Sequence, residues 1–534
     1  MNSNKTHILF YNSDRLQKPV KFLVLLFFIS QFLTAFSQEK KSIAKLQGTE
    51  LNTTIRLNYI PVDMPLHLFP TRRGDMGIIG LHYQASINKW LYGGVAMHFA
   101  VTGDQGGLFT LGAELGMQQK IYKNLFFDAN FHFGGGGGFR SLVKSGGFIN
   151  PNIGLKYKLK KINFGVQFSN INFYSGVINS NSVSFFIEIP NSLYFSDYTD
   201  RQQVFTSDVT NSDYFWKKPA TKNVQQIRFD FLFPFGKSKR HDLTSLTNTL
   251  ALLEFEYQRY LNKSTFAYVH SGAIYKGLRA GFMDLFFGIG HNFVQTQYIN
   301  LFAKMGIGAA GGRIAAEGGL TMYPSTGFDV KLSKNVSLSS HVGYYRALAG
   351  EFEAYTLGFG VKYNSLNGGT ESTSDKKHTQ FKTLGNRINF QNQTYFNAQK
   401  TDAPFSVDLQ MIGMQYTFDI TDNIYYIGEA SFAYGGESGG YAHGITGLGI
   451  KTNPFIKNKM RAHLEIVGGI AGGAGVDTGE GIVYRPTIGL SYEVVKNVAL
   501  FASAGKMIAP FGNFNTTNVN IGLSFGMSTL SVKK

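Results

Sequence analysis

The sequence predicts an all-β fold, with antiparallel transmembrane β-barrels built from three homologous repeats of about eight strands each. Three observations predict it. Long stretches alternate apolar and polar residues over strands of ~9 to 12 residues, enough to cross a bilayer. The composition combines 62 glycines, 48 phenylalanines and 28 tyrosines with a mean hydropathy of only -0.09. One set of motifs also occurs three times in the same order.

The clearest repeated motif is a predicted hairpin. Each copy has an alternating run, a glycine pair, a short loop, the motif P-x-x-G and a second alternating run, over residues 125–161, 301–335 and 461–497. The glycine pairs are Gly137-Gly138, Gly311-Gly312 and Gly472-Gly473. Each repeat opens on an arginine, namely Arg56, Arg228 or Arg387, followed by an apolar residue, Asn or Asp, and an aromatic residue. Because start, middle and end recur in order, the chain is predicted to be a triplication.

Residues 1–37 have the three parts of a secretory signal peptide. A basic leader precedes the largely apolar residues 22–36, and Ala35-Phe36-Ser37 before Gln38 fits the small-x-small cleavage rule. A signal anchor is the alternative, although the apolar core is short for a membrane span. With cleavage, the chain is exported. No later run approaches the ~20 apolar residues of a spanning helix.

The repeats divide the chain into six predicted parts. These are a signal peptide (1–37), β-barrel repeat 1 (38–190), a linker (191–223), repeat 2 (224–363), a turn-forming linker (364–385) and repeat 3 (386–530). Within them, the clearest strands are expected at residues 53–62, 76–87, 91–101, 109–118, 125–133, 152–159, 254–258, 283–290, 407–411, 463–466 and 516–527.

One face of these strands is too polar to form a dry core, so it is predicted to line the barrel lumen, with the apolar face turned to lipid. The predicted lumen-facing network consists of Glu114, Asp128, His132, Lys156, Lys158, Glu254, Glu256, Asp284, Asp408 and Glu465. Buried charges must pair, so Lys156 and Lys158 are expected to neutralise Glu114 and Asp128. Along 407–411, Val407, Leu409 and Met411 are expected on the apolar face.

The composition and the motifs exclude several kinds of chemistry. The formal net charge of +17 favours association with polyanions such as lipid phosphates, but the basic residues are scattered and no nucleic-acid stripe is formed. Without cysteine, thiol chemistry and lipid modification of a cysteine are excluded. The match to G-x-G-x-x-G at Gly306–Gly311 leads into Pro324 and a second strand instead of a helix, so no cofactor is predicted. No metal-ligand spacing stands out.

The segment Asn520–Met527 resembles the C-terminal β-signal of Gram-negative outer-membrane barrels, which the barrel-insertion machinery reads. The positions that carry the likeness are Asn520, Gly522, Phe525 and Met527. Met527 stands where the family usually has an aromatic residue, and the chain continues to Lys534. Each repeat is also similar to a small eight-stranded outer-membrane barrel. The resemblance implies an outer-membrane location, with lipid, the insertion machinery and an envelope protein as partners.

Several functions stay open at this stage. If the repeats join into one barrel of ~24 strands, a channel or export conduit is expected; if they close separately, each lumen is filled and a structural or partner-binding barrel is expected. A non-enzymatic protein is predicted. One alternative is an outer-membrane lipase or protease using His98, Glu114, Asp128 and His132. The other is a soluble secreted β-repeat adhesin, which requires Phe127, Phe131 and Leu155 to lie in a packed core.

Overall fold

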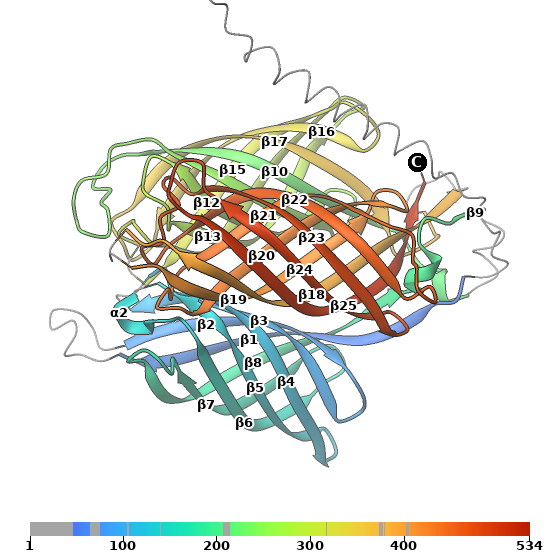
Figure 1. Ribbon diagram of the computed structural model, residues 1–534. Helices are drawn as coiled ribbons and strands as arrows, with labels where there is room; N and C mark the ends of the chain where they lie inside the picture. Colours follow the sequence, from blue (N-terminus) through green and yellow to red (C-terminus); the bar gives the residue numbers. More distant parts are fainter. Residues whose placement is uncertain are drawn as a thin grey trace, which may run out of the picture. The chain divides into compact units, whose positions relative to one another are not determined.

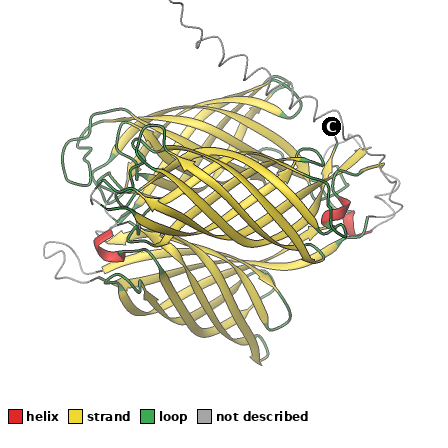
Figure 2. Cartoon of the chain, in the orientation of Figure 1, coloured by secondary structure: helices red, strands yellow, loops and turns green. Residues whose placement is uncertain are grey.

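The computed structural model describes residues 46–64, 75–103, 106–138, 140–206, 214–316, 318–372, 378, 380–401 and 405–533. The predicted signal peptide lies outside these residues. Most of the described chain is strand, joined by loops and a few very short helical turns (Figure 2). No helix in the described ranges combines the length and the apolar character that a bilayer span requires.

The first barrel contains the strands β1 to β8 (Figure 1). They are β1 Thr49–Asp63, β2 Asp75–Ser86, β3 Leu91–Gly103, β4 Phe109–Tyr122, β5 Leu125–Gly137, β6 Phe148–Lys158, β7 Asn163–Asn172 and β8 Asn179–Phe195, with the one-turn helix α2 (Arg140–Val143) before β6. Each strand pairs with its neighbour in sequence, and β1 pairs antiparallel with β8 from Thr49↔Phe195 to Tyr59↔Phe185. The sheet is therefore closed, with no free edge.

The second and third barrels close in the same way. The second contains β10 Thr221–Pro234, β11 Leu250–Tyr260, β12 Thr265–Lys276, β13 Met283–Gln295, β14 Ile299–Gly311, β15 Leu320–Lys331, β16 Val336–Ala347 and β17 Glu353–Asn367. The third contains β18 Gln380–Ala398, β19 Val407–Asp419, β20 Ile424–Gly435, β21 Ala442–Lys451, β22 Met460–Gly472, β23 Ile482–Val495, β24 Val498–Ile508 and β25 Asn515–Val532. β10 pairs with β17, and β18 pairs with β25.

The three repeats thus close separately instead of joining into one barrel. The pairing of the first and last strands runs over fourteen to fifteen residues in the second and third barrels, from Thr221↔Asn367 to Pro234↔Ala354 and from Phe381↔Val532 to Tyr395↔Asn518. By contrast, the ladder between β17 and β25 is one pair, Asn367↔Ser531. Local closure therefore satisfies the backbone of each repeat by itself.

The two ends of each barrel differ. Tight turns such as Lys123-Asn124 and Lys496-Asn497 connect the strands at one end, called here the turn end, where Lys123 (φ 44°) and Asn497 (φ 67°) adopt left-handed backbone. Longer connections, including residues 235–249 and 473–481, lie at the other end, called here the loop end. At the loop end, each lumen is filled by an apolar cluster that contains Phe148 in the first barrel, Phe286 in the second and Tyr441 in the third.

The predicted linkers are too wide. β8 runs to Phe195, and the linker that follows contains two 3-10 turns, η2 (Tyr198–Asp200) and η3 (Tyr214–Trp216), and the short strand β9 (Val204–Thr206), which pairs with β18. β17 extends to Asn367 and β18 begins at Gln380, six residues before the predicted start. The sequence missed these extensions because the strand ends pair with each other beyond the alternating core, where no apolar pattern is needed.

Candidate functional site

A cluster of paired charges crosses the lumen of the first barrel. Arg56 on β1 donates from Nη2 to Glu188 Oε1 at 2.6 Å and to Asp128 Oδ1 at 2.8 Å. Lys156 Nζ lies 2.8 Å from Asp128 Oδ2 and 3.1 Å from Glu188 Oε1. All four side chains are at most 3% exposed. Because β1 and β5 stand on opposite sides of an eight-stranded ring, the pair of Arg56 and Asp128 fills the bore.

Glu114 has a different partner from the predicted one. Its Oε2 lies 2.9 Å from Nδ1 of His82, and its Oε1 accepts from Gln84 Nε2 at 3.1 Å. Lys156 neutralises Asp128 as expected, but Lys158 does not pair with Glu114. Its Nζ lies 4.0 Å from the Phe126 ring centroid, near the turn end of β6. Lys158 occupies the wider mouth of the lumen, where a charged side chain reaches water.

His132 belongs to a buried group of three histidines. Its ring centroid lies 4.8 Å from that of His98 and 5.9 Å from that of His82, and Phe148 covers it at 5.0 Å. His98 and His132 have no exposed surface. His98 and His132 are thus enclosed beneath the apolar cluster of the loop end.

The second barrel has a denser charge cluster around Arg228 on β10. Its Nε donates to Glu254, its Nη1 to Glu256 Oε2 at 2.9 Å and its Nη2 to Asp230 Oδ2 at 2.7 Å. Lys304, on the opposite strand β14, donates to Glu256 Oε2 at 2.5 Å. These groups are buried, so each carboxylate depends on the two cations for its neutralisation.

Among the described residues, one group in this lumen has ligand atoms close enough to hold a metal ion: Glu254, His270 and Asp284. Arg228 Nη2 lies 3.2 Å from His270 Nδ1, and a guanidinium only donates, so Nδ1 accepts and the proton stays on Nε2. Nε2 is the atom that faces Glu254 and Asp284, at 3.3 and 3.5 Å. Metal binding needs a free lone pair there, so the arrangement fits an internal charge cluster better than a metal site.

The third lumen is bridged by Arg485 on β23. It forms a bidentate pair with Glu429 on β20, at 2.9 and 2.7 Å, and His443 Nε2 lies 3.0 Å from the same carboxylate. The predicted lumen residue Glu465 is also inside, 6% exposed, and accepts from Tyr425 Oη at 2.7 Å. In each barrel, therefore, an arginine and its carboxylates connect strands across the lumen.

Asp408 does not face the lumen, contrary to the prediction. It is exposed, and its Oδ1 accepts from the backbone N–H of Asn397 at 2.9 Å. Leu409 and Met411 point inward instead and are fully buried in the apolar cluster of the loop end. The sequence misassigned this strand because its inside is apolar at the loop end and becomes polar only further along, where Gln415 and Asp419 are buried.

The turn end of the third barrel is closed by the linker, through Tyr198 of η2. Its hydroxyl donates to Asp419 Oδ2 at 2.9 Å and accepts from Lys451 Nζ at 2.6 Å, and its backbone N–H donates to Asn497 Oδ1 at 3.0 Å. Burial raises the pKa of Tyr198 to about 12, so the hydroxyl keeps its proton at neutral pH. The first barrel differs, because a cavity of about 610 Å³ at its turn end reaches Lys156 and Glu188.

The outer surfaces of the barrels are apolar. Phe131 and Leu155 are each 43% exposed and Ile466 is 60% exposed, whereas Glu114 and Lys156 inside the first barrel are 3% exposed. This is the reverse of a protein with an apolar core and a polar surface, and it excludes the soluble adhesin alternative. Closed sheets with apolar outsides and ionic insides are the β-structures that a bilayer accepts. The chain therefore forms transmembrane β-barrels.

Comparisons with known proteins find matches among solved structures. No protein-family model and no curated protein sequence matches the chain. Similar solved structures include a mutant of the ferric enterobactin receptor PfeA of Pseudomonas aeruginosa, at 7% identity over 91% of this chain and 81% of that chain, with a TM-score of 0.27. OpdQ of the same organism has 8% identity over 90% of this chain and 98% of its own, with a TM-score of 0.19. A de novo designed transmembrane β-barrel has 13% identity over 28% of this chain and 98% of its own, also at 0.19.

The residues of the C-terminal motif form part of the wall of the third barrel. Asn520 faces the lumen and donates to Ser503 Oγ at 3.1 Å, and Gly522 pairs with Gln391 of β18. Met527 is buried, and Phe525 meets Phe195 of β8 edge-on at 5.7 Å. Because β25 continues to Val532, the motif ends inside the strand. Its role in membrane insertion stays a prediction.

The glycine pairs of the repeats form three equivalent junctions between the barrels. An added Cβ at Gly311 would lie 2.2 Å from the Cα of Gly107, and one at Gly137 would lie 2.3 Å from the backbone nitrogen of Gly440. At the third junction, an added Cβ at Gly472 would lie 2.5 Å from the Cβ of Ala280. In each case the fifth strand of one barrel meets the loop between the third and fourth strands of another.

An apolar cluster beside these junctions completes the contact. It joins residues of all three barrels: Phe99, Val101, Phe109 and Leu111 from the first, Leu285 and Ala309 from the second, and Phe432 from the third. The sequence predicts that these residues of the first barrel point outward, and they do. The pattern does not distinguish an outward residue that contacts lipid from one that contacts a neighbouring barrel. The three repeats therefore contact one another in a cyclic, threefold-related order.

Sequence reasoning missed several residues of the lumen networks. Arg56 and Arg228 were visible as repeat markers, and their fixed position at the start of each repeat was the signal that could have identified them as charge centres. His82 and Glu188 lie on the polar sides of β2 and β8 and could have been found by extending the alternation. Tyr198 had no signal, because it lies in a segment without periodicity.

Proposed function

We propose that the protein is a non-conducting, non-enzymatic outer-membrane protein, whose three barrels form one structural block that presents loops to a partner. The observation that carries the proposal is that a buried ion-pair network crosses each lumen. In the second barrel, this network connects the opposite strands β10 and β14 through Arg228, Glu256 and Lys304. An eight-stranded barrel has room only for its own side chains, so such a network leaves no continuous water path.

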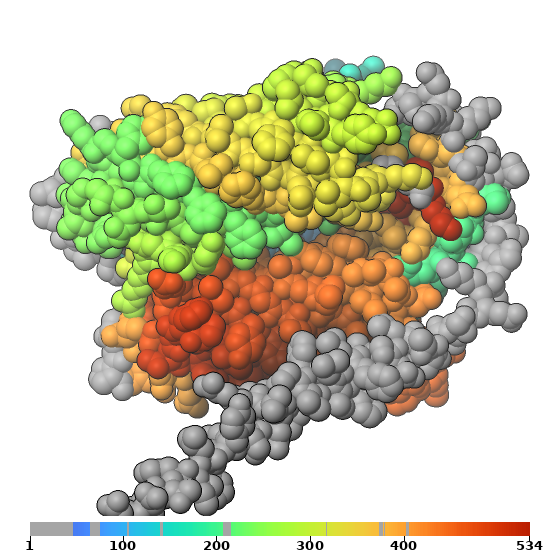
Figure 3. Space-filling model, turned by 90° about the horizontal axis from the view of Figure 1, so that it is seen from above, coloured from blue at the N-terminus to red at the C-terminus, as the bar shows by residue number. Residues whose placement is uncertain are grey.

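The loop end supports the same proposal. Apolar clusters lie between the ion pairs and the loops in all three barrels, so solute entry from that end requires core residues to move. The short linker segment at Tyr198 closes the third barrel at its turn end. Figure 3 shows the outward side chains of the second barrel (green to yellow) and the third (orange to red) as packed walls on the face in view.

Partner binding is proposed from the arrangement of the loops. The glycine junctions bring loops of different barrels together at the loop end, for example the loop at Gly106-Gly107 and the loop at Gly312–Gly319. A partner would therefore meet a surface made by several barrels at once. Loops carried on rigid barrels are a common place for recognition, because the scaffold fixes them at low entropic cost.

Planar-bilayer recordings on the purified full chain test the proposal. The expected result is the absence of discrete conductance steps from protein whose folding is verified by heat-modifiable migration on a gel. Reproducible large steps from folded protein would overturn it. The matched comparison is the double variant Arg485→Ala with Glu429→Ala, which removes both members of the pair that crosses the third lumen and is expected to raise the leak current.

A further inference from the structure

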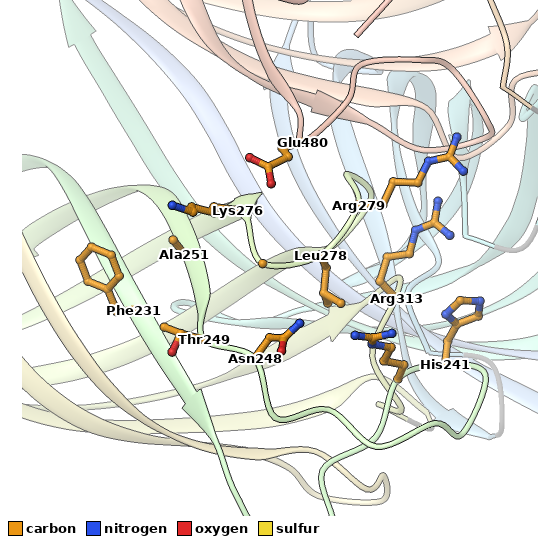
Figure 4. A pocket seen from close by; sticks show the side chains of 12 residues that line it. Phe231, His241, Asn248, Thr249, Ala251, Lys276, Leu278, Arg279, Arg313 and Glu480 are labelled. Atoms are coloured by element: carbon orange, nitrogen blue, oxygen red, sulfur yellow. The ribbon is translucent and has the colours of Figure 1, made fainter. Parts of the chain in front are cut away.

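A basic pocket opens at the loop end of the second barrel. It has a volume of about 760 Å³ and is lined by Arg240, His241, Lys276, Arg279 and Arg313, with one carboxylate, Glu480, on a loop of the third barrel (Figure 4). Lys276 is the last residue of β12, and the other basic residues come from three different loops of the second barrel. None of the lumen networks uses them.

These cations have no counter-charges of their own. Within the described part of the chain, neither Lys276 nor any of the three arginines forms an ion pair with a carboxylate, and Nε of Arg240 is buried with no hydrogen-bond partner. Arg313 donates from Nε to the carbonyl of Ala280 at 3.4 Å, and Arg279 donates to Thr401 Oγ1. The remaining guanidinium N–H groups are therefore available to an anion.

The backbone holds the arginines together. Arg240 and Ile314 form an isolated antiparallel bridge, and the N–H of His241 donates to the carbonyl of Arg313 at 3.2 Å. Arg313 has a left-handed backbone (φ 75°), an unfavourable conformation for a residue with a side chain. Burial and the neighbouring Arg279 also lower the pKa of Arg313. Like charges kept close by a constrained backbone indicate a site for a bound anion.

The arginine that follows the glycine pair is specific to the second repeat. The residue after the glycine pair is Arg313 in this repeat, but Phe139 and Ala474 at the equivalent positions of the others. A charge needed for the junction between barrels would recur in all three. Arg313 is therefore not needed for the junctions that all three repeats form.

The other lining residues indicate the kind of anion. Phe231 lies on β10 with the same orientation as Phe229 and Phe233, which are 46% and 43% exposed on the lipid-facing side. Leu278 adds a second apolar residue beside the cations. The pocket thus joins a basic rim to the apolar outer wall of the barrel. A ligand that fits both parts has an anionic head and hydrocarbon chains.

We propose that this pocket binds the phosphate monoester headgroup of a membrane lipid, with the acyl chains along the outer wall of the second barrel. Arg240, Arg279 and Arg313 contact the phosphate oxygens, and Phe231 and Leu278 contact the first methylenes. This site is independent of the proposed non-conducting role, because it lies outside the lumens.

The test uses the full chain in detergent, with bisphosphorylated lipid A as the probe and native mass spectrometry to count bound lipid. Arg240→Gln combined with Arg313→Gln is expected to weaken binding by about tenfold or more, since two charge-assisted contacts are lost. The control, Lys237→Gln with Lys334→Gln, removes two exposed lysines that do not line the pocket and is expected to bind as the wild type does.

Equal binding by the wild type and the pocket variant would overturn the proposal. Competition identifies the source of the phosphate: displacement of the lipid by millimolar inorganic phosphate at equal affinity would overturn the assignment to a lipid, and failure to displace it supports the assignment. If the first variant loses its heat-modifiable folded band, Lys276→Gln with Arg279→Gln replaces it, and the same tenfold loss is expected from that pair.

Discussion

The three lumens differ from one another, whereas the three junctions between the barrels are alike, although both come from the same repeat. Each lumen has its own set of ion pairs: Arg56 with Asp128 in the first barrel, and Arg485, six strands into the repeat, with Glu429 in the third. Each junction uses the same glycine positions. A lumen requires only that buried charge is neutralised, and many combinations achieve this. A junction requires two backbones at contact distance, which only residues with little or no side chain allow.

The largest effect is expected inside a lumen. Arg228→Gln removes the cation shared by Glu254, Glu256 and Asp230, and leaves Lys304, which contacts Glu256, to neutralise the buried carboxylates. Breaking a buried ion pair costs about 3–5 kcal/mol, so the free energy of unfolding should fall by at least that amount. Urea unfolding in lipid vesicles, followed by the heat-modifiable band, measures it. Arg259→Gln on the same barrel is exposed and should change little; equal effects would contradict the difference between lumen and surface.

A smaller effect is expected at a junction. Gly311→Ala places a Cβ 2.2 Å from the backbone of Gly107 in the first barrel, and backbone cannot move aside as a flexible side chain can. Overpacking of this kind costs about 1–3 kcal/mol. The expected signature is faster hydrogen exchange at residues 106–108 with the lumen amides unchanged. Gly428→Ala is the control, because its added Cβ has no heavy atom within 4 Å. Unchanged exchange at 106–108 in the first variant would show that the junction is loose.

A still smaller loss of stability is expected where the linker closes the third barrel. Tyr198→Phe deletes the hydroxyl between Asp419 and Lys451 but keeps the ring, which lies 4.3 Å from the guanidinium carbon of Arg387. The loss of one such hydrogen-bonding group costs about 1 kcal/mol, because the direct pair of Lys451 and Asp419 remains. Hydrogen exchange at Gln202 and Thr383 should rise by a few-fold. Tyr298→Phe, on an exposed tyrosine, serves as the control.

The smallest effect concerns pH. Burial lowers the pKa of Lys218, between η3 and β10, to about 8. The unfolded linker has the ordinary, higher pKa and binds more protons between pH 8 and pH 10, so the docked linker should gain stability as pH rises through that window and stay constant below it. The urea midpoint of Trp216 fluorescence in a Trp90→Phe background measures this. Lys218→Met should remove the pH dependence, and a midpoint that falls with rising pH would contradict the assignment.

Much of the architecture could be predicted from the sequence. The alternation of apolar and polar residues predicts which side of β4, β5 and β6 faces the lumen, because successive side chains of a strand point to opposite faces. The same rule failed at Asp408, where the inside of the strand changes from apolar to polar along its length. The lumen position of Glu465 could be read from one strand, whereas the partner of Glu114 could not, because His82 lies on a strand that meets it only through the curvature of the barrel.

The sequence by itself determined that the chain is a triplicated, two-sided sheet with apolar residues outside and charges inside, because that pattern is local and repeats along each strand. Tertiary structure alone decided that each repeat closes on itself, because closure depends on hydrogen bonds between β1 and β8, or β18 and β25, whose sequences carry no mark of their partner. It also decided the role of the glycine pairs and of Tyr198. A glycine and a single tyrosine act through the residues that contact them in the folded protein, and these contacts cannot be read from the local sequence.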